Sequence, residues 1–323
     1  MLLEVKNLYV DFEGMRGRTE ALKNIRFTLE EGEILGIVGE SGSGKSITAL
    51  SILGLLEENA IISNGEIIYN GQNLLHLQKK ERQKLRGKEI GMVFQEPMTA
   101  LHPTMKIGKQ LQNCLQRHRN LPAKEAKEAV LQALRDVHID QPEQVANKYP
   151  FELSGGMRQR IVIALAMSAP PRLLIADEPT TALDVTIQYE ILNLIQELNQ
   201  KRGTSVLLIT HDLGVVAKLC SRTIVMYAGE VVESGATKEI LHHPAHPYTR
   251  SLLDALPDSV PPGEPLKAIA GETPSLLRRP SGCAFAFRCR HAMDICKKRH
   301  PELTEKAPNH HTACWLEGTA VYD

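Results

Sequence analysis

The sequence predicts an α/β fold, in which short strands and amphipathic helices alternate around a mostly parallel sheet. One uncharged run, 34–38, ends at a glycine-rich loop that is followed by an apolar segment of helical length. Two further short apolar runs, 172–177 and 205–210, are typical of strands buried on both faces. Between these two runs, apolar residues recur on one face of a predicted helix: Ile187, Ile191, Leu194, Ile195 and Leu198.

The other elements follow in chain order. Residues 2–38 are expected to form strands, because apolar side chains alternate from Leu3 to Phe12. Segments 65–70 and 89–94 are predicted to be further strands.

A helical region and a linker complete the expected order. Residues 104–137 are predicted to be helical, with a break near Pro122. Six prolines fall within the 24 residues from Pro257 to Pro280, which indicates an extended linker before a small cysteine-bearing tail.

The composition excludes several classes of protein. The chain has 323 residues, and its 24% charged and 42% apolar content is that of a globular protein rather than a disordered one. Lys plus Arg and Asp plus Glu both number 38, so the chain lacks the positive charge expected of a dedicated nucleic-acid-binding protein. Aromatic residues make up only 4%, which leaves few side chains for stacking on bases.

The distribution of charge also argues against a membrane span. No stretch without Asp, Glu, Lys or Arg exceeds 11 residues, whereas a membrane-spanning helix needs about 20 mostly apolar residues. Glu4 and Asp11 interrupt the N-terminal region where a signal peptide would be apolar. We therefore expect the protein to stay in the cytosol.

A phosphate-binding loop is the strongest motif. The segment GESGSGKS, 39–46, has the GxxxxGK[ST] spacing and lies between a predicted strand and a predicted helix. Its glycines let backbone N–H groups surround phosphate oxygens, Lys45 can reach the β and γ phosphates, and the Ser46 hydroxyl can bind Mg²⁺. The alternative is a chance glycine turn, which the strand and helix on either side disfavour.

Two acids follow the buried run 172–177. Asp177 at the end of this strand would hold Mg²⁺, and Glu178 would orient a water molecule that attacks the γ-phosphate. Paired acids after a strand are otherwise a helix cap or a solvated turn.

A second phosphate-binding turn is possible at LSGGMRQR, 153–160. Ser154, Gly155 and Gly156 precede a predicted helix, so their N–H groups can hold phosphate, although Ser154 can also be a plain N-cap. A second such turn in one chain requires either a second nucleotide or a second chain.

These motifs together resemble the ATP-binding cassette (ABC) family. The motifs GESGSGKS, VFQEP, LSGGMRQR, LLIADEPT, TALD and LITHD occur in the order and spacing of that family, over residues 1–256. EPMTALHP, ADEPTTALDVTIQ, MYAGEVVE and HPYT resemble the ATPase subunits of bacterial oligopeptide and dipeptide importers, most of all the D-type subunit.

The resemblance implies a P-loop NTPase cassette with a RecA-like parallel-sheet core, an antiparallel β subdomain and a helical subdomain at about 97–168. Residues 257–282 are then the linker and residues 283–323 the C-terminal extension. The resemblance also implies ATP hydrolysis, with Mg²⁺, by a chain that pairs with an F-type ATPase, two permease subunits and, indirectly, an extracytoplasmic peptide-binding protein. No nucleic-acid partner is expected, and the chain would lie peripherally on the cytoplasmic face of the membrane.

The resemblance assigns a role to each matching residue. Glu178 would be the catalytic base, Lys45 would stabilise charge, Gln95 would contact Mg²⁺ and the attacking water, and His211 would contact the γ-phosphate. Ser46, Gln95 and Asp177 would surround Mg²⁺. Ser154, Gly155 and Gly156 would close over ATP held by the other subunit, and Asp184 would communicate across the dimer. The residues expected to contact ATP are Phe12, Gly39, Glu40, Ser41, Gly42, Ser43, Gly44, Lys45, Ser46 and Ile47, of which Phe12 is either the adenine-stacking aromatic or part of the core.

The tail contains four of the six cysteines: Cys283, Cys289, Cys296 and Cys314. A tail of this size needs a covalent or metal constraint, and four thiolates can hold Zn²⁺ or an iron–sulfur cluster. The gaps of five, six and seventeen residues are wider than the usual zinc pairs and favour a 4Fe-4S cluster, which some peptide importers carry in this extension. The alternatives are unligated thiols and a mixed zinc site with His291, His300, His310 or His311.

The sequence therefore predicts the ATPase subunit of an importer for short peptides. The same ATPase role in an importer of nickel or another small solute is the alternative within this class, and a non-transport ABC ATPase is the alternative outside it. Because no phosphate-contacting residue is expected beyond His211, the tail is not expected to affect ATP hydrolysis chemistry.

Overall fold

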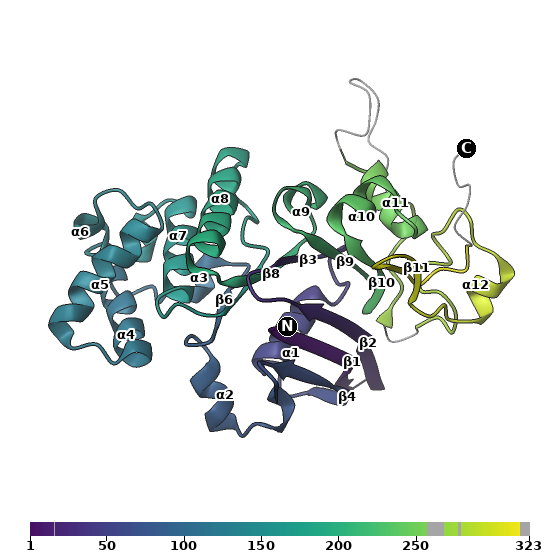
Figure 1. Ribbon diagram of the computed structural model, residues 1–323, viewed down its shortest axis with the longest axis horizontal. Coiled ribbons are helices and arrows are strands. Elements are labelled where there is room, and N and C mark those ends of the chain that lie inside the picture. The colour runs from purple at the N-terminus through teal and green to yellow at the C-terminus, as the bar shows by residue number, and fades with distance from the viewer. Residues whose placement is uncertain (16, 257–267, 277–278, 317–323) are drawn as a thin grey trace. The chain divides into compact units, whose positions relative to one another are not determined.

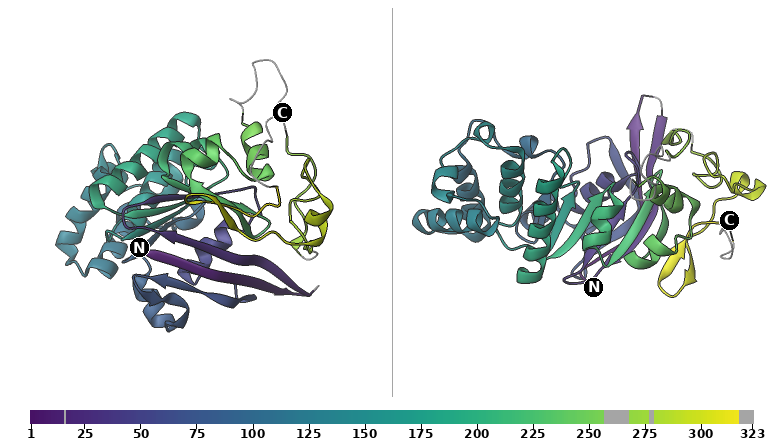
Figure 2. Two further views of the ribbon diagram at one scale, coloured as in Figure 1. Left: turned by 45° about the vertical axis from the view of Figure 1, so that its right-hand side comes forward. Right: turned by 90° about the horizontal axis from the view of Figure 1, so that it is seen from above.

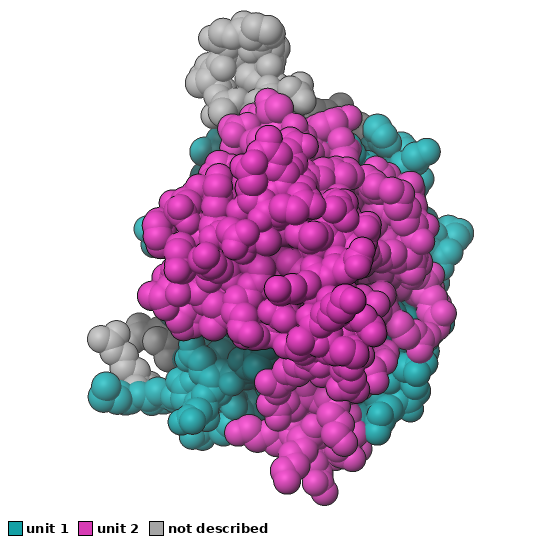
Figure 3. Space-filling view, turned by 90° about the vertical axis from the view of Figure 1, so that its left-hand side faces the viewer, with its two compact units in different colours: residues 1–29, 35–75, 210–323 teal, residues 30–34, 76–209 magenta. Residues whose placement is uncertain are grey.

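The computed structural model describes residues 1–15, 17–256, 268–276 and 279–316. The chain forms two compact units, coloured separately in Figure 3: unit 1 is residues 1–29, 35–75 and 210–323, and unit 2 is residues 30–34 and 76–209. Much of the predicted linker, 257–267 and 277–278, lies outside the described residues. The domain boundaries expected from the sequence stay a prediction.

Figure 1 labels the elements along the chain. Those of unit 1 are β1 (Leu3–Gly14), β2 (Gly17–Leu29), β3 (Ile34–Val38), α1 (Lys45–Leu53), β4 (Ala60–Tyr69), β5 (Gln72–Asn73), the 3₁₀ helix η1 (Leu74–His76), α9 (Leu213–Leu219), β9 (Arg222–Tyr227), β10 (Glu230–Ala236), α10 (Thr237–His242), α11 (Pro247–Asp254), α12 (Asp294–Lys298), β11 (Thr304–Ala307) and β12 (His310–Thr312).

The N-terminal strands form an antiparallel sheet in the order β2-β1-β4-β5, and the purple strands lie side by side in the left view of Figure 2. The predicted alternation is confirmed, because Leu3, Val5, Leu8 and Val10 are buried on β1. Phe12 on the same strand is half-buried, so it is not part of the closed core.

The phosphate-loop strand belongs to a second sheet of unit 1. All five residues of β3 are buried, and β3 pairs in parallel with β9. From β9 the order continues antiparallel through β10 and β12 to β11. Since β11 and β12 come from the C-terminal tail, the tail extends the sheet that carries the phosphate loop.

Unit 2 contains the helical region and the second set of parallel strands. Its elements are α2 (Lys79–Leu85), β6 (Ile90–Val93), α3 (Pro97–Ala100), α4 (Ile107–Arg119), α5 (Ala123–Asp136), α6 (Pro142–Val145), the 3₁₀ helix η2 (Pro150–Glu152), α7 (Gly155–Ala166), β7 (Leu173–Asp177), α8 (Val185–Arg202) and β8 (Ser205–Thr210).

In unit 2 the strands β6, β7 and β8 pair in parallel, and every residue of β7 and β8 is buried, as the uncharged runs predict. The predicted helical break is confirmed between α4 and α5, where Asn120 adopts a left-handed conformation and Pro122 precedes the next helix. None of the helices in the described part of the chain is both long and apolar enough to cross a bilayer.

Candidate functional site

The phosphate loop of unit 1 has the backbone that its glycines predict. A Cβ on Gly39 would lie 2.2 Å from the carbonyl oxygen of Met226, so a side chain cannot fit between β3 and β9 at this point. Gly44 caps α1 with φ of 99°, a left-handed conformation that favours glycine. The loop therefore delivers its backbone directly to the N-terminus of α1, where anions bind well.

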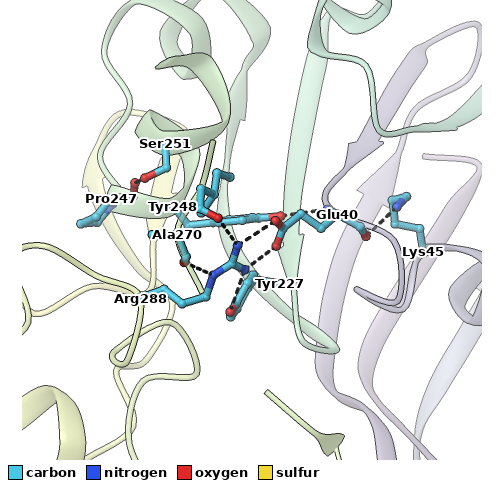
Figure 4. A network of polar contacts seen from close by, with 9 residues as sticks. Glu40, Lys45, Tyr227, Pro247, Tyr248, Ser251, Ala270 and Arg288 are labelled. Atoms are coloured by element: carbon cyan, nitrogen blue, oxygen red, sulfur yellow. Dashed lines mark hydrogen bonds and ion pairs between the residues drawn. The ribbon is translucent and has the colours of Figure 1, made fainter. Parts of the chain in front are cut away.

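Lys45 is buried at the start of α1, and Figure 4 shows its side chain turned toward the loop. Its Nζ donates hydrogen bonds to the carbonyl oxygens of Gly39 (2.8 Å) and Glu40 (3.0 Å). The Ser43 hydroxyl is also buried and has no hydrogen-bond partner among the described residues. Ser46, the next residue of α1, is half-buried. The loop thus holds one ammonium group and one unsatisfied hydroxyl.

In unit 2 the structure brings two predicted residues into contact. Asp177 is the buried last residue of β7, and Glu178 follows it with φ of 45° while its N–H donates to the carbonyl of Ile209. The Gln95 Nε2 donates to Glu178 Oε2 at 3.0 Å, although 83 residues separate them. The Thr181 hydroxyl donates to the same oxygen at 2.8 Å, a contact that sequence reasoning did not identify.

The SGG turn begins α7, also in unit 2. Ser154 is the N-cap and accepts a hydrogen bond from the N–H of Met157 at 3.3 Å, so the plain capping interpretation is confirmed while the residue stays exposed. A Cβ on Gly156 would lie 2.6 Å from Ile187 Cγ2 on α8, whereas Gly155 is exposed. Asp184 is the exposed N-cap of α8 and accepts from the N–H of Ile187.

The predicted ATP-contacting residues are thus divided between the two units. The phosphate loop, half-buried Phe12 and exposed His211, which follows β8, belong to unit 1. Gln95, Asp177, Glu178, the SGG turn and Asp184 belong to unit 2.

The four tail cysteines line one cavity. Cys283, Cys289, Cys296 and Cys314 all border it, together with His246, Pro247, Phe285, Ala286, His291, Trp315 and Leu316. All four are free thiols, and no group of three or more His, Cys, Asp or Glu side chains in the described ranges is arranged to hold a single metal ion. The four cysteines that the sequence groups in the tail therefore converge on one cavity.

The surroundings of this cavity are largely apolar. Burial raises the pKa of the Cys283 thiol to about 12, and the neighbouring thiols raise it as well. Burial also raises the pKa values of Cys289 and Cys314.

His246 is a residue of this cavity that sequence reasoning missed. It is 1% exposed, and burial lowers its pKa to about 4, so the ring is neutral. Its Nδ1 accepts from the N–H of Tyr248 at 3.0 Å, so its Nε2 carries the proton, and this N–H has no partner among the described residues. This buried N–H is therefore available to an acceptor.

Two histidines of the mixed zinc alternative do not border this cavity and lie near carboxylates, and of the two His310 is the one within hydrogen-bond distance. His310 Nε2 lies 2.7 Å from the Glu233 carboxylate, which raises the pKa of His310. His300 Nδ1 lies 3.6 Å from Glu230. Of the four candidates, His291 is the one that borders the cysteine cavity in the described part of the chain.

Comparison with known proteins gives matches along almost the whole chain. The pattern of the ABC transporter family matches residues 22–181, and that of the oligopeptide/dipeptide transporter C-terminal region matches residues 232–296. The oligopeptide transport ATP-binding protein OppD of Bacillus subtilis is 48% identical over 317 residues, which cover 98% of this chain and 88% of that protein. The dipeptide transport ATP-binding protein DppD of Lactococcus lactis is 48% identical over 316 residues, which cover 98% of this chain and 90% of that protein.

Solved structures agree with these sequence matches. A dimeric ATP-binding cassette in a post-hydrolysis state, bound to ADP and phosphate, superposes with a TM-score of 0.66 and 30% identity. The match covers 73% of this chain and 99% of that chain.

Proposed function

This chain belongs to the ABC transporter family, and from that premise we propose that it is the ATP-hydrolysing subunit of an importer of oligopeptides or dipeptides. The observation that carries the proposal is the extent of the match. Relatives named for peptide transport are 48% identical over nearly the full chain, and the peptide-transporter pattern covers the tail as far as Cys296.

The contacts described above support a division of labour in ATP hydrolysis. Lys45 stabilises the β and γ phosphates, and the unsatisfied Ser43 hydroxyl donates to a phosphate oxygen. Glu178 orients the attacking water and accepts its proton, while Gln95 and Thr181 hold the Glu178 carboxylate in place. His211 contacts the γ-phosphate.

We assign Mg²⁺ to Ser46, Gln95 and Asp177, as the sequence predicts, because hydroxyl, amide and carboxylate oxygens are ligands that Mg²⁺ accepts. When bound, it neutralises charge that develops on the phosphate oxygens.

The SGG turn is assigned to a nucleotide that a second ATPase chain holds. Ser154, Gly155 and Gly156 are presented at the N-terminus of α7, where backbone N–H groups attract phosphate. We assign them to ATP held by an F-type partner subunit, with Asp184 at the contact between subunits. The assembly includes two permease subunits and, indirectly, an extracytoplasmic peptide-binding protein, with this chain on the cytoplasmic face of the membrane.

The glutamate-to-glutamine variant Glu178→Gln tests the function. In the reconstituted transporter, with the matching change in the partner ATPase, peptide-stimulated ATP hydrolysis should fall by a factor of about 100 to 10,000, because an amide cannot accept the proton of the attacking water. ATP binding should persist, since the amide has the same shape. The control is Glu125→Gln, which removes an exposed acid on α5.

Two results would contradict the proposal. Wild-type hydrolysis by the Glu178→Gln transporter would show that another group activates the water. Stimulation by Ni²⁺ and its binding protein, but not by peptides, would replace the peptide assignment by that of a metal importer.

We further propose that the cysteine cavity holds a 4Fe-4S cluster. Four thiols on one cavity provide the ligand set of such a cluster, and the unpartnered Nε2–H of His246 provides a donor for one of its sulfurs. Zn²⁺ is the alternative.

Elemental analysis tests the cluster. The full chain purified without oxygen should contain about four irons and absorb broadly near about 400 nm. Cys283→Ser should lose most of the iron, whereas Cys114→Ser, which changes a half-buried thiol on α4, should keep it. One zinc per chain without iron would replace the cluster by a zinc site. If the protein contained neither iron nor zinc, both the cluster and the zinc site would be refuted.

A further inference from the structure

Arg288 lies in the turn that carries the first two cysteines of the cavity. The N–H of Cys289 donates to the carbonyl of Phe285 at 3.0 Å, and the N–H of Arg288 donates to the same carbonyl at 2.9 Å. The N–H of Cys283 donates to the carbonyl of Cys296 at 2.7 Å. The backbone position of Arg288 is therefore set by the same turn that places the cysteines.

The side chain of Arg288 reaches the phosphate loop, 248 residues away in sequence (Figure 4). Its Nη1 lies 2.6 Å from Glu40 Oε2 and its Nη2 lies 3.0 Å from Glu40 Oε1. The Arg288 side chain is 5% exposed and that of Glu40 is 27% exposed. A bidentate, largely buried ion pair of this kind is strong, and it fixes the orientation of the Glu40 carboxylate as well as its distance from Arg288.

Aromatic rings pack against the ion pair between Arg288 and Glu40. Tyr227, Tyr248 and Phe285 are fully buried and pack together, with centroid distances of 4.6 Å between the two tyrosines and 5.3 Å from each to Phe285. Phe285 also borders the cysteine cavity. The guanidinium of Arg288 lies over the rings of Tyr227 (5.7 Å) and Phe285 (5.9 Å).

Glu40 is held at three points as a result. Arg288 holds its carboxylate, the Tyr248 hydroxyl accepts a hydrogen bond from its N–H at 2.8 Å, and its carbonyl accepts from Lys45 Nζ at 3.0 Å. The last contact joins the network to the ammonium group that is assigned to the ATP phosphates.

We propose that Arg288 is a positioning residue for ATP, which couples the cysteine cavity to the phosphate loop through Glu40. The inference rests on the proposed ATPase function. Arg288 keeps the loop near its binding conformation, so less conformational freedom is lost when ATP binds. It also neutralises a carboxylate that would otherwise repel the phosphates. Because such coupling is reciprocal, bound ATP must stabilise the cysteine turn in return.

Nucleotide affinity gives the first test. Dissociation constants for a non-hydrolysable ATP analogue with Mg²⁺ are measured by calorimetry on the full chain, purified without oxygen. Arg288→Gln should weaken binding about tenfold, because it removes the ion pair with Glu40 and leaves the Glu40 carboxylate unpaired. Glu40→Gln should weaken binding less, because it removes the ion pair without leaving an unpaired carboxylate. The double variant should resemble Glu40→Gln. Arg288→Lys, which keeps the charge, should restore part of the affinity.

Arg279→Gln is the matched control. Arg279 also ties the C-terminal part of the chain to the cassette, through the Glu230 carboxylate at 2.7 Å and the carbonyls of Glu20 and Ala228, but these contacts are outside the phosphate loop. An equal loss of affinity in Arg279→Gln and Arg288→Gln would show a general loss of stability and overturn the proposal. The proposal would also be overturned if the effects of Arg288→Gln and Glu40→Gln on affinity were additive, or if neither of these two variants changed the affinity.

The reciprocal effect gives the second test. The saturating ATP analogue should slow iron removal by a chelator or, in metal-free chain, alkylation of Cys283 and Cys289 by N-ethylmaleimide, by about fivefold or more. In Arg288→Gln at saturating analogue this protection should disappear, while in Arg279→Gln it should remain. Equal protection in wild type and Arg288→Gln would overturn the coupling. Wild-type chain that binds no nucleotide would instead refute the ATPase function itself.

Discussion

Lys45 illustrates how much of this site is determined at the scale of a single residue. Its ammonium is buried and donates to the carbonyls of Gly39 and Glu40, so backbone oxygens help to fix its position. This arrangement keeps a cation inside the loop, where an anionic phosphate can replace backbone oxygens as its partner.

Lys45→Ala should therefore weaken ATP binding rather than only slow turnover. The loss of a charged donor to phosphate is worth about 1.5 to 3 kcal/mol, so the dissociation constant should rise by a factor of about 10 to 150. Calorimetry with Mg²⁺ and a non-hydrolysable ATP analogue measures this change. Lys124→Ala, on the exposed face of α5, is the control and should leave the affinity unchanged. Unchanged affinity in Lys45→Ala would remove Lys45 from the phosphate site.

At the scale of elements, the strand β12 shows how the tail is attached. β12 pairs with β10. The fully buried Glu233 of β10 accepts hydrogen bonds from His310 Nε2 of β12 at 2.7 Å and from the N–H groups of Ala245 and His246. One buried carboxylate thus joins the tail, β10 and the start of α11.

This buried pair should make attachment of the tail depend on pH. Glu233 raises the pKa of His310 in the folded chain, so the charged pair contributes its full stability below the unfolded histidine pKa of about 6.5. The contribution is lost as pH rises through the higher folded pKa. His310→Gln should remove this dependence and cost about 3 kcal/mol at low pH.

Trp315 provides the measurement. It is the one tryptophan of the 323-residue sequence and lies three residues after β12, so urea unfolding followed by tryptophan fluorescence reports on the tail. In wild type the urea midpoint should decrease as the pH rises from about 6 to about 9. In His310→Gln the midpoint should be lower and should change less with pH. His311→Gln, on the same strand but without a buried acid, should behave as wild type does. A wild-type slope in His310→Gln would show that another group titrates.

At the scale of the whole molecule, the tail is integrated with the phosphate-loop unit. Several contacts tie it there, among them the pairing of β12 with β10, the His310–Glu233 contact and the Arg288–Glu40 ion pair. That no residue beyond His211 contacts phosphate stays a prediction, but the sequence did not indicate that Arg288 contacts the phosphate loop itself. The cysteine cavity and the phosphate loop therefore share one network of contacts.

The sequence by itself determined the features that depend on neighbouring residues. Apolar runs predicted β3, β7 and β8, and the helical break near Pro122 was predicted correctly. The glycine spacing predicted the loop from Gly39 to Ser46, because only glycine tolerates the close approach at Gly39 and the backbone of Gly44. These features are local, so the chain encodes them within a few residues.

Only the tertiary structure decided which distant side chains meet. With 38 basic and 38 acidic residues, nothing in the sequence selects Arg288 as the partner of Glu40. The contact between Gln95 and Glu178 spans 83 residues, and the burial that leaves the N–H of His246 unpartnered among the described residues exists only in the folded chain. Such pairs depend on how strands and turns far apart in the chain are brought together, and burial then decides which contacts are strong. Neither the approach of these distant segments nor the burial of their contacts can be predicted from residue type and spacing.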